Sequence, residues 1–329
     1  MSDESTPKPE PRNPKSRILY LFTRTPLHVG AGSSVGAIDQ PIIRERHTGF
    51  PVIPATSLKG TFADAWNDGL LEEQNDHGET RRVRVKKDGT ASDAAWLFGS
   101  DNDKHAAGGA LQFSEGRLLA FPIRSARGSF AWITCPLLLQ RAARDGALHR
   151  ALLEELNEPK DDEALFDADS GSKLAIDTQI VLEEYTFRAA GWTGLRKLGE
   201  AIANLLQDDL VWAEIKGRLV ILSNGLMSFF AQNACEIAQH VRIDDETGTA
   251  AGGALFNQEN VPSETMLYSV LHAFDERTAN KGRSDRRKAD AALDAFGKKL
   301  AEKQVFQFGG DASTGLGYCT VKLNGEKGA

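Results

Sequence analysis

The stretch GAIDQPIIRERHTGFPVIPATSLKG, residues 36–60, gathers an acid, several basic groups and a helix start within one short span. Asp39 ends a run of small residues, and the pattern after it is extended. In an extended segment, side chains two residues apart share a face, so Arg44 and Arg46 are expected to point the same way. Either this is an ordinary charged surface or a polyanion lies across it, and the residues alone leave both open.

Two segments could bind an anion. A helix is expected from about Thr56, with Thr56 or Ser57 as its N-cap and Lys59 in its first turn. The free N–H groups of a helix start, a hydroxyl and a lysine suit a phosphate oxygen. Near the C-terminus, the glycines of GGDASTGLGY (309–318) would let the backbone approach a ligand and form an anion nest. An ordinary cap with a solvated lysine, and a hairpin loop, remain the alternatives.

Acid–base groups lie close to the first of these segments. Asp39 alone could be a turn residue, and His28 and His47 could be surface or core residues. Paired with Asp39, either histidine could take part in acid–base chemistry. The sequence has no HExxH motif, no nucleophile elbow and no acidic trio spaced as in a two-metal nuclease.

The composition is that of a globular protein in water. With 329 residues, 41% of them hydrophobic and 26% charged, the chain can bury a sizeable core. It has no apolar run as long as a membrane span, and its start lacks the apolar segment of a signal peptide. Cys135, Cys235 and Cys319 are far apart, which favours reduced thiols in a cytoplasmic protein over a zinc site. Residues 1–16 are polar and proline-rich, and we expect a disordered tail.

Charge is unevenly distributed along the chain. The net charge of −7 counts against a nucleic-acid partner, yet residues 81–87 and 277–288 are basic. Residues 154–169 are acidic, and we expect an exposed loop there. The net charge therefore does not decide which partner the protein binds.

The pattern of apolar residues predicts an α+β fold with an antiparallel sheet. Strands alternate irregularly with helices, and no GxGxxG follows the first strand, which disfavours a doubly wound parallel sheet. We expect one domain over 17–329, with an insertion at about 67–94 and a polar hairpin at about 241–262. Other expected elements include a strand over 17–24, helices over 195–215, 224–239 and 284–303, and two strands flanking the glycine-rich loop.

Several of these motifs together resemble those of a known family. AIDQPIIRERHTGFPVIP–SLKG and FGGDASTGLGY are similar to signatures of the RAMP superfamily of CRISPR proteins, and more narrowly of the backbone subunit of the type III-B (Cmr) effector complex. LFGS (97–100) and VRIDDETGTAAGGALFNQENVP also fit, so the resemblance covers about 17–323. It implies a modified RRM-like, ferredoxin-like palm with insertions and a protruding β-hairpin thumb, the thumb falling on about 241–262. Copies would stack into a helical filament along one CRISPR RNA.

The resemblance also implies roles for individual residues. Asp39 would be the catalytic residue and could hold a divalent metal ion, Mg or Mn, while His28 and His47 could be accessory. Contacts to RNA would come from Arg44, Arg46, Ser57, Lys59, Gly309, Gly310, Thr314 and Gly315.

The activity implied is that of an endoribonuclease. Working with other subunits of the complex, it would cleave complementary target RNA at regular intervals by metal-assisted attack of the 2′-hydroxyl. Base pairing with the guide would supply the sequence specificity. The alternative is a catalytically silent RNA-binding scaffold in the same complex.

Overall fold

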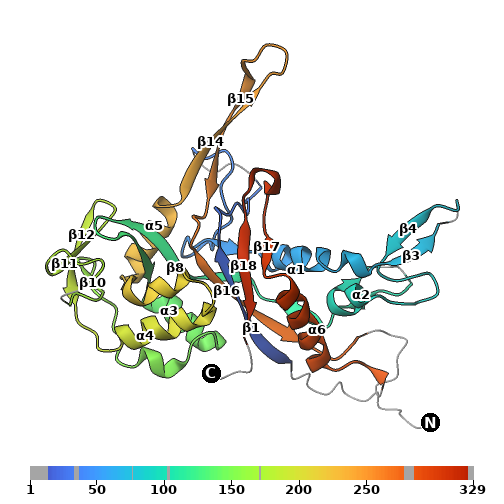
Figure 1. The fold of residues 1–329 in the computed structure, drawn as a ribbon, viewed down its shortest axis with the longest axis horizontal. Helices are drawn as coiled ribbons and strands as arrows, with labels where there is room; N and C mark the ends of the chain where they lie inside the picture. Colours follow the sequence, from blue (N-terminus) through green and yellow to red (C-terminus); the bar gives the residue numbers. More distant parts are fainter. Residues whose placement is uncertain are drawn as a thin grey trace, which may run out of the picture.

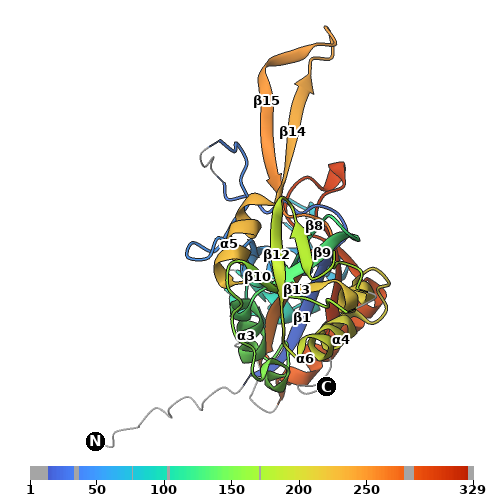
Figure 2. The same ribbon diagram turned by 90° about the vertical axis from the view of Figure 1, so that its left-hand side faces the viewer.

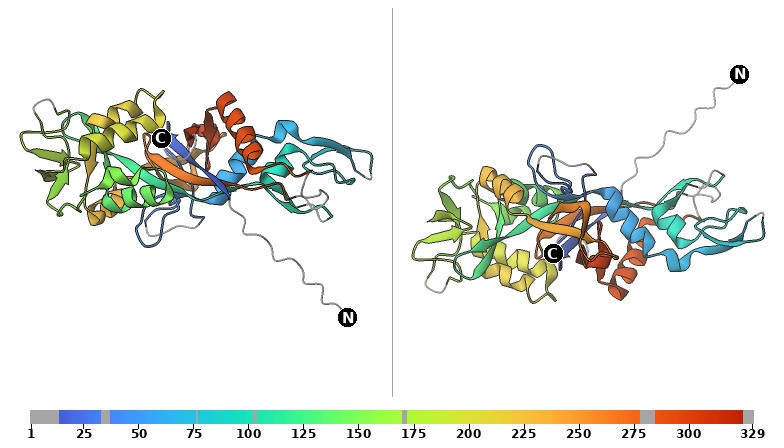
Figure 3. Two further views of the ribbon diagram at one scale, coloured as in Figure 1. Left: turned by 90° about the horizontal axis from the view of Figure 1, so that it is seen from below. Right: turned by 90° about the horizontal axis from the view of Figure 1, so that it is seen from above.

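The computed structural model describes residues 14–32, 37–75, 77–101, 104–169, 172–277 and 285–324. Residues 251–254 are described as backbone only. The tail expected at 1–16 lies almost wholly outside these ranges. The long axis of the molecule runs from the β3–β4 hairpin at one end to strands β10–β12 at the other (Figures 1 and 3).

Strand β1 (Lys15–Thr23) lies between two hydrophobic cores, and both of its faces are apolar. Leu19 and Leu21 point into one core, whereas Tyr20 and Phe22 point into the other, as the period of two requires. The first core contains Phe62 of α1 (Ala55–Asp64) and Phe296 of α6 (Ala289–Glu302). The second contains Trp132 and Trp212, and the Phe22 and Trp212 rings are 5.2 Å apart.

The strands next to β1 are antiparallel to it. They are β16 (Met266–Ala273) and β18 (Tyr318–Leu323), and β8 (Gly116–Ser125) pairs antiparallel with β16. Helix α1 precedes β8 in the chain, and α6 lies between β16 and β18. The order β8-β16-β1-β18 thus comes from two strand–helix–strand crossovers, and the expected α+β class with antiparallel pairing is observed.

The sheet extends on both sides of this centre. Among the described residues it contains twelve strands, in the order β11-β12-β10-β13-β9-β8-β16-β1-β18-β17, with β2 and β7 joined off this path. The other members are β2 (Val52–Ile53), β7 (Leu111–Phe113), β9 (Ser129–Thr134), β10 (Glu163–Leu165), β11 (Gln179–Leu182), β12 (Tyr185–Ala190), β13 (Leu219–Ile221) and β17 (Val305–Gln307).

Three two-stranded ribbons lie outside the main sheet. They are β3 (Leu71–Gln74) with β4 (Thr80–Val83), β5 (Gly99–Ser100) with β6 (Ala107–Gly108), and β14 (Glu236–Ile243) with β15 (Ala250–Asn260). The β14–β15 hairpin projects away from the rest of the molecule (Figures 1 and 2). The other helices are α2 (Asp93–Phe98), α3 (Pro136–Asp145), α4 (Leu195–Ala203) and α5 (Asn224–Asn233), and the 3-10 helices are η1 (Asn67–Gly69), η2 (Arg150–Leu153), η3 (Asn204–Leu206), η4 (Trp212–Gly217) and η6 (Ala312–Thr314).

Two predicted helices are shorter than expected. The segment 195–215 is helical as α4 and then breaks, because the Asp209 side chain accepts hydrogen bonds from the N–H groups of Val211 and Trp212 and starts η4. The helix expected over 224–239 ends at Asn233, since from Glu236 onward the chain pairs with β15. Cross-strand pairing overrides the helical periodicity there.

Two other expectations were wrong in detail. The acidic segment 154–169 is not entirely an exposed loop, since it contains β10 and the buried run Ala164, Leu165 and Phe166. Three consecutive apolar residues suit a strand covered on both faces. The last long helix begins at Ala289 rather than near residue 284. The N–H of Ala289 donates to the Asp275 carboxylate at 3.0 Å, and this contact comes from outside the helix.

Candidate nucleic-acid interface

The base of strand β15 joins the Asp39 segment to the glycine-rich loop, which is one of the two segments that were expected to bind an anion. Side chains of successive strand residues point to opposite sides. Asn257 and Glu259 therefore contact the segment 37–44. Gln258 lies between them and points the other way, where its Nε2 donates to Asp311 Oδ2 of the glycine-rich loop at 2.6 Å. Residues far apart in the sequence thus meet on either side of one strand.

Asp39 is exposed and held against this strand. Its N–H donates to Asn257 Oδ1 at 2.8 Å, and its Oδ2 accepts from the N–H of Asn257 at 2.9 Å. Among the described residues, no hydrogen bond to Asp39 Oδ1 is found. One carboxylate oxygen therefore fixes the loop to β15 through a long-range contact, which differs from the local hydrogen bond of a turn residue. The exposed residue keeps a second oxygen that could act as an acid–base group or a metal ligand.

Arg44 forms a buried ion pair with Glu259. Its Nη2 lies 2.5 Å from Glu259 Oε1, and the two side chains are only 18% and 4% exposed. Its Nη1 donates to the carbonyls of Gly49 and Ala231, each at 2.7 Å. Glu259 Oε2 accepts from the N–H of Ile42 at 3.0 Å. The Arg44 guanidinium therefore holds together the hairpin base at Glu259, the end of α5 at Ala231 and the turn at Gly49. Its contact with RNA stays a prediction.

The two arginines do not share a face. The chain turns at residues 46–48, immediately after the extended segment, so the alternation expected from Arg44 to Arg46 ends there. Arg46 is exposed on this turn. Arg44 Nη2 also contacts the Cys235 sulfur at 3.2 Å, and burial raises the pKa of that thiol to about 11. Cys235 therefore remains a neutral part of the buried cluster.

Helix α1 starts one residue earlier than predicted. Pro54 is its N-cap, with φ of −55°, and its carbonyl accepts from the N–H of Leu58 at 3.1 Å. Because the proline ring already fixes this φ, the chain enters the helix before the hydroxyl residues, which lie inside the first turn. No side chain caps this end. Ser57 is half-buried and Lys59 is exposed. The first N–H groups of the helix have no partner within it.

The glycine-rich loop packs close to α1 and to the segment before Asp39. The Phe62 ring of α1 lies 5.6 Å from that of Phe308, the residue before the loop. Gly309 has φ of +77°, and a Cβ there would lie 2.0 Å from the carbonyl oxygen of His28. The same carbonyl accepts from the N–H of Gly310 at 3.0 Å. Glycine is required at 309 both by conformation and by space.

The rest of the loop is held from within. Gln307 Nε2 reaches four loop carbonyls, those of Phe308, Gly309, Gly310 and Leu316, at 3.1–3.2 Å. Thr314 Oγ1 donates to the carbonyl of Asp311 at 2.9 Å, and Gly315 has φ of +89° with open space around its Cα. Gly309, Gly310 and Thr314 are exposed, and Gly315 is half-buried. The loop therefore presents a rigid, exposed backbone.

Neither histidine has a recorded contact with Asp39 in the described part of the chain. His28 is buried, with Nδ1 2.7 Å from the Glu259 carbonyl oxygen, so it packs between the hairpin base and the glycine-rich loop. His47 is exposed, with Nε2 3.0 Å from Arg141 Nη2 and 3.7 Å from Glu45 Oε2. Burial opposes ionisation of Glu45, but hydrogen bonds from Thr48 and Arg141 outweigh it and keep the pKa of Glu45 below its usual value.

The projecting hairpin has exposed apolar side chains among its polar ones. It spans 236–260 rather than 241–262, because its strands reach down to the pair Glu236 and Asn260. Val241 and Leu255 are opposite each other and are 49% and 70% exposed. The rings of His240 and Phe256 stack on the other face, 5.1 Å apart. Exposed apolar side chains on a projecting ribbon indicate a surface that becomes covered.

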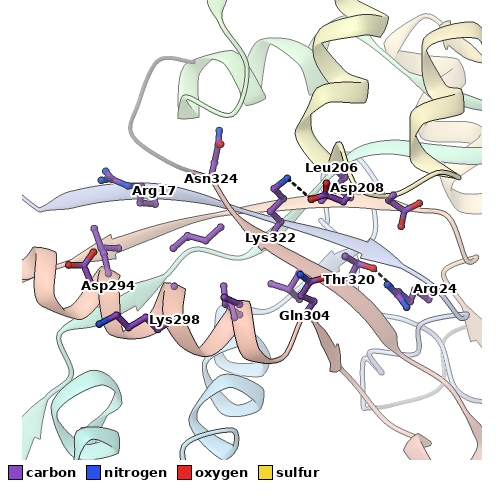
Figure 4. Close-up of a pocket in the computed structure, with 17 residues that line it drawn as sticks. Arg17, Arg24, Leu206, Asp208, Asp294, Lys298, Gln304, Thr320, Lys322 and Asn324 are labelled. Atoms are coloured by element: carbon purple, nitrogen blue, oxygen red, sulfur yellow. Dashed lines mark hydrogen bonds and ion pairs between the residues drawn. The ribbon is translucent and has the colours of Figure 1, made fainter.

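A separate cavity of about 570 Å³ lies between α6 and β18 (Figure 4). Its charged side chains have both signs. Arg24 Nε donates to Thr320 Oγ1 at 2.7 Å, and Lys322 Nζ lies 3.7 Å from Asp208 Oδ2. The mixed charges do not select a polyanion, and the cavity residues do not include any of the predicted site residues.

Several charged residues of the basic and acidic runs are paired within the protein. Arg81 pairs with Glu73 at 3.0 Å, and Arg287 pairs with Glu276 and lies 3.6 Å above the Trp96 ring. In the acidic segment, Arg196 pairs with Asp169 at 2.9 Å. Residues 278–284 of the second basic run lie outside the described residues.

No helix among the described residues is long and apolar enough to cross a membrane. In the same ranges, no three His, Cys, Asp or Glu side chains are grouped so that they could hold a metal ion together.

Comparison with known proteins gives consistent matches over nearly the whole chain. A family model described as the RAMP superfamily matches residues 21–320. The CRISPR system Cmr endoribonuclease Cmr4 of Pyrococcus furiosus is 30% identical over 314 residues, which are 94% of this chain and 96% of that protein. The CRISPR system Cms endoribonuclease Csm3 of Enterococcus italicus is 32% identical over 107 residues, 31% of this chain and 45% of that protein.

Solved structures show the same fold. Oligomeric Cmr4 from Pyrococcus furiosus has a TM-score of 0.63 at 24% identity, with 95% of this chain and 98% of that chain covered. A chain of the type III-B Cmr-beta complex bound to cognate target RNA has a TM-score of 0.64 at 19% identity, with 95% and 98% covered. The mixed α+β fold is therefore that of the Cmr4 structures.

The buried pair predicts a large difference between the two arginines. Arg44→Ala would leave Glu259 buried and unpaired, and should lower the free energy of unfolding by about 3–5 kcal/mol. Arg46→Ala, on the exposed turn, should change it by no more than about 0.5 kcal/mol. Urea denaturation of both variants measures the difference, and equal stabilities would show that the ion pair does not organise this region.

Proposed function

The chain belongs to the RAMP superfamily, and on this basis we propose that it is the repeated backbone subunit of a type III-B CRISPR effector complex. It binds CRISPR RNA, joins further copies of itself and other subunits of that complex, and cleaves target RNA through Asp39. The observation that carries this proposal is the state of the Asp39 carboxylate. One of its oxygens is fixed to the projecting hairpin, and the residue is exposed.

Two comparisons support this proposal. The relative from Pyrococcus furiosus is named an endoribonuclease and matches over 94% of this chain. One similar structure is a type III-B complex bound to cognate target RNA. The strand order β8-β16-β1-β18, with α1 and α6 as crossovers, is that of a ferredoxin-like sheet. It supports a modified RRM-like palm, with β14–β15 as the thumb.

The guide RNA would lie along α1 and the glycine-rich loop. Lys59 and the uncapped N–H groups beside Ser57 suit one phosphate, and the exposed backbone at 309–315 suits a strand passing close by. Arg46, which is exposed and lies in the sequence between Asp39 and α1, would add positive charge to this RNA-binding surface. Backbone contacts of this kind hold the RNA without reading its sequence, which leaves specificity to base pairing.

The apolar hairpin would open the guide–target duplex. Val241 and Leu255 could enter between stacked bases and displace a nucleotide, as apolar wedges do in other nucleic-acid complexes. A displaced nucleotide frees the backbone to bring its 2′-hydroxyl in line with the adjacent phosphate. Repeated copies along one guide would then place the cuts at regular intervals.

Asp39 supplies the reactive carboxylate at that position. Its Oδ1 would accept the proton of the 2′-hydroxyl, while Oδ2 stays bonded to Asn257. A single protein carboxylate, completed by RNA phosphates and water, is a usual way to hold Mg²⁺ and would also accept Mn²⁺. When bound there, such an ion would stabilise the charge that develops on the phosphate. The alternative, a silent scaffold, would have the same contacts with Asp39 serving only the turn.

Lys59 tests the guide-binding surface. Lys59→Ala should weaken guide RNA binding by a similar factor for every guide sequence. It should also reduce the slope of log K against log salt by about one unit, as expected for one lost phosphate contact. Filter binding at several salt concentrations measures both. Lys197→Ala, a matched loss of charge on α4, should behave as wild type. A changed preference among guide sequences would contradict the phosphate assignment.

Leu255 tests the wedge. Burying a leucine contributes about 1.5 kcal/mol or more, so Leu255→Ser should slow target cleavage by roughly tenfold or more. Guide binding should be unaffected, and stability nearly so, because this side chain is 70% exposed. The same change at Leu210, which is 86% exposed between η3 and η4, is the control. Cleavage by the assembled complex that is equal in both variants would exclude a wedge at this position.

Asp39 separates the enzyme from the scaffold. Asp39→Asn keeps an acceptor for the Asn257 N–H but removes the charge and basicity, so assembly and guide binding should remain near wild type. Cleavage of target RNA by the assembled complex should fall at least about a hundredfold, the usual effect of losing an acid–base group. Asp39→Ala should be similarly inactive, and Asp245→Asn at the hairpin tip should be fully active. Wild-type cleavage by both Asp39 variants would favour the scaffold.

A further inference from the structure

We propose that Asn257 is a positioning residue for Asp39, so that the projecting hairpin sets the place of the carboxylate. This inference rests on the proposed function, because it concerns the same cleavage. Asn257 uses every polar group it has on one short segment. In addition to its two hydrogen bonds with Asp39, its Nδ2 donates to the carbonyl of Ala37 at 3.1 Å, and its own carbonyl accepts from the N–H of Gln40 at 3.1 Å.

These four hydrogen bonds fix both position and direction. Two of them come from the Asn257 main chain, so they set the register of residues 37–40 along β15. The other two come from its amide, which matches one donor and one acceptor of the segment. Only asparagine or glutamine carries both groups on a side-chain amide. With a shorter or apolar side chain at position 257, only the two main-chain hydrogen bonds of that residue would hold the Asp39 segment.

The anchor beneath Asn257 is stiff. The N–H of Glu259 donates to the carbonyl of Gln40 at 2.9 Å, and Gln40 and Gln258 form a parallel bridge. Glu259 is in turn held by the buried Arg44. The Asp39 segment therefore behaves as a short third strand along the hairpin base, and a shift of β15 carries it along.

This arrangement has a consequence for the reaction. Asn257 and Leu255 lie two residues apart on the same face of β15, so the exposed apolar group and the carboxylate have a fixed offset along one strand. A nucleotide displaced by the hairpin then presents its phosphate at a set distance from Asp39. The cut would be positioned by the hairpin itself, with no requirement for the distant parts of the palm.

Asn257→Ala tests this in the complex assembled with guide RNA. It removes both amide contacts and leaves the main-chain contacts and the Asp39 carboxylate in place. Because misplacing a reactive group by about 1 Å can cost a hundredfold in rate, we expect single-turnover cleavage to fall by roughly ten- to a hundredfold. The Kd for target RNA and the assembly of the complex should stay within about twofold of wild type. Gln239→Ala, the cross-strand neighbour of Asn257 on β14, is the matched control and should cleave as wild type.

The possible results separate the two proposals. A slower cleavage step with unchanged Kd supports positioning by Asn257. Wild-type cleavage, or a loss of target binding in proportion to the loss of cleavage, would overturn it and leave Asp39 as the catalytic group. The proposed function itself fails only if Asp39→Asn, measured beside it, cleaves normally. Should Asn257→Ala not assemble, Asn257→Ser provides the same comparison, because its shorter hydroxyl cannot reproduce both amide contacts.

Discussion

The buried pair of Arg44 and Glu259 is the constraint on which the arrangement of the site depends. An ion pair so little exposed forms only if its remaining donors and acceptors are also satisfied. Here they are, through the carbonyls of Gly49 and Ala231 and the N–H of Ile42. The contacts tie the hairpin base to α5 and to the segment after Asp39. Such a network contributes little to the free energy of folding but fixes how these segments are aligned, because only one alignment satisfies all of its hydrogen bonds.

Strand periodicity does the rest of the assembly. With Glu259 fixed, the alternation along β15 directs Asn257 to the Asp39 segment and Gln258 to the glycine-rich loop. A slip of one residue would exchange these sides and separate both loops from their partners. One short stretch of strand thus aligns the loop that would cut the RNA with the loop that would hold it.

The secondary-structure elements could be predicted from the sequence, but the long-range contacts between them could not. The strand over 17–24, the helix near Thr56, the glycine-rich loop and the polar hairpin could all be predicted, because each depends on local period or on glycine. The contact between Arg44 and Glu259 could not, since it joins residues more than two hundred positions apart and both look like surface charges in sequence. Asn257 was missed for the same reason. Its only local signal is a run of polar residues at the end of a strand, which is equally typical of an exposed edge.

The start of α1 was misplaced because Pro54 fixes its own φ and needs no hydroxyl cap.

The distribution of charge explains how an acidic chain can bind a polyanion. Many acids of the segment 154–169 and its surroundings are paired, as Asp162 is with Arg188 and Asp169 with Arg196. Strands β10–β12 of that region lie at one end of the long axis, away from the hairpin (Figure 1). Beyond about a Debye length their field is screened at physiological salt. The RNA-facing surface proposed here is instead mostly glycine backbone, helix N–H groups and a few cations. Its affinity would come from oriented dipoles and close approach, which the net charge of the chain does not measure.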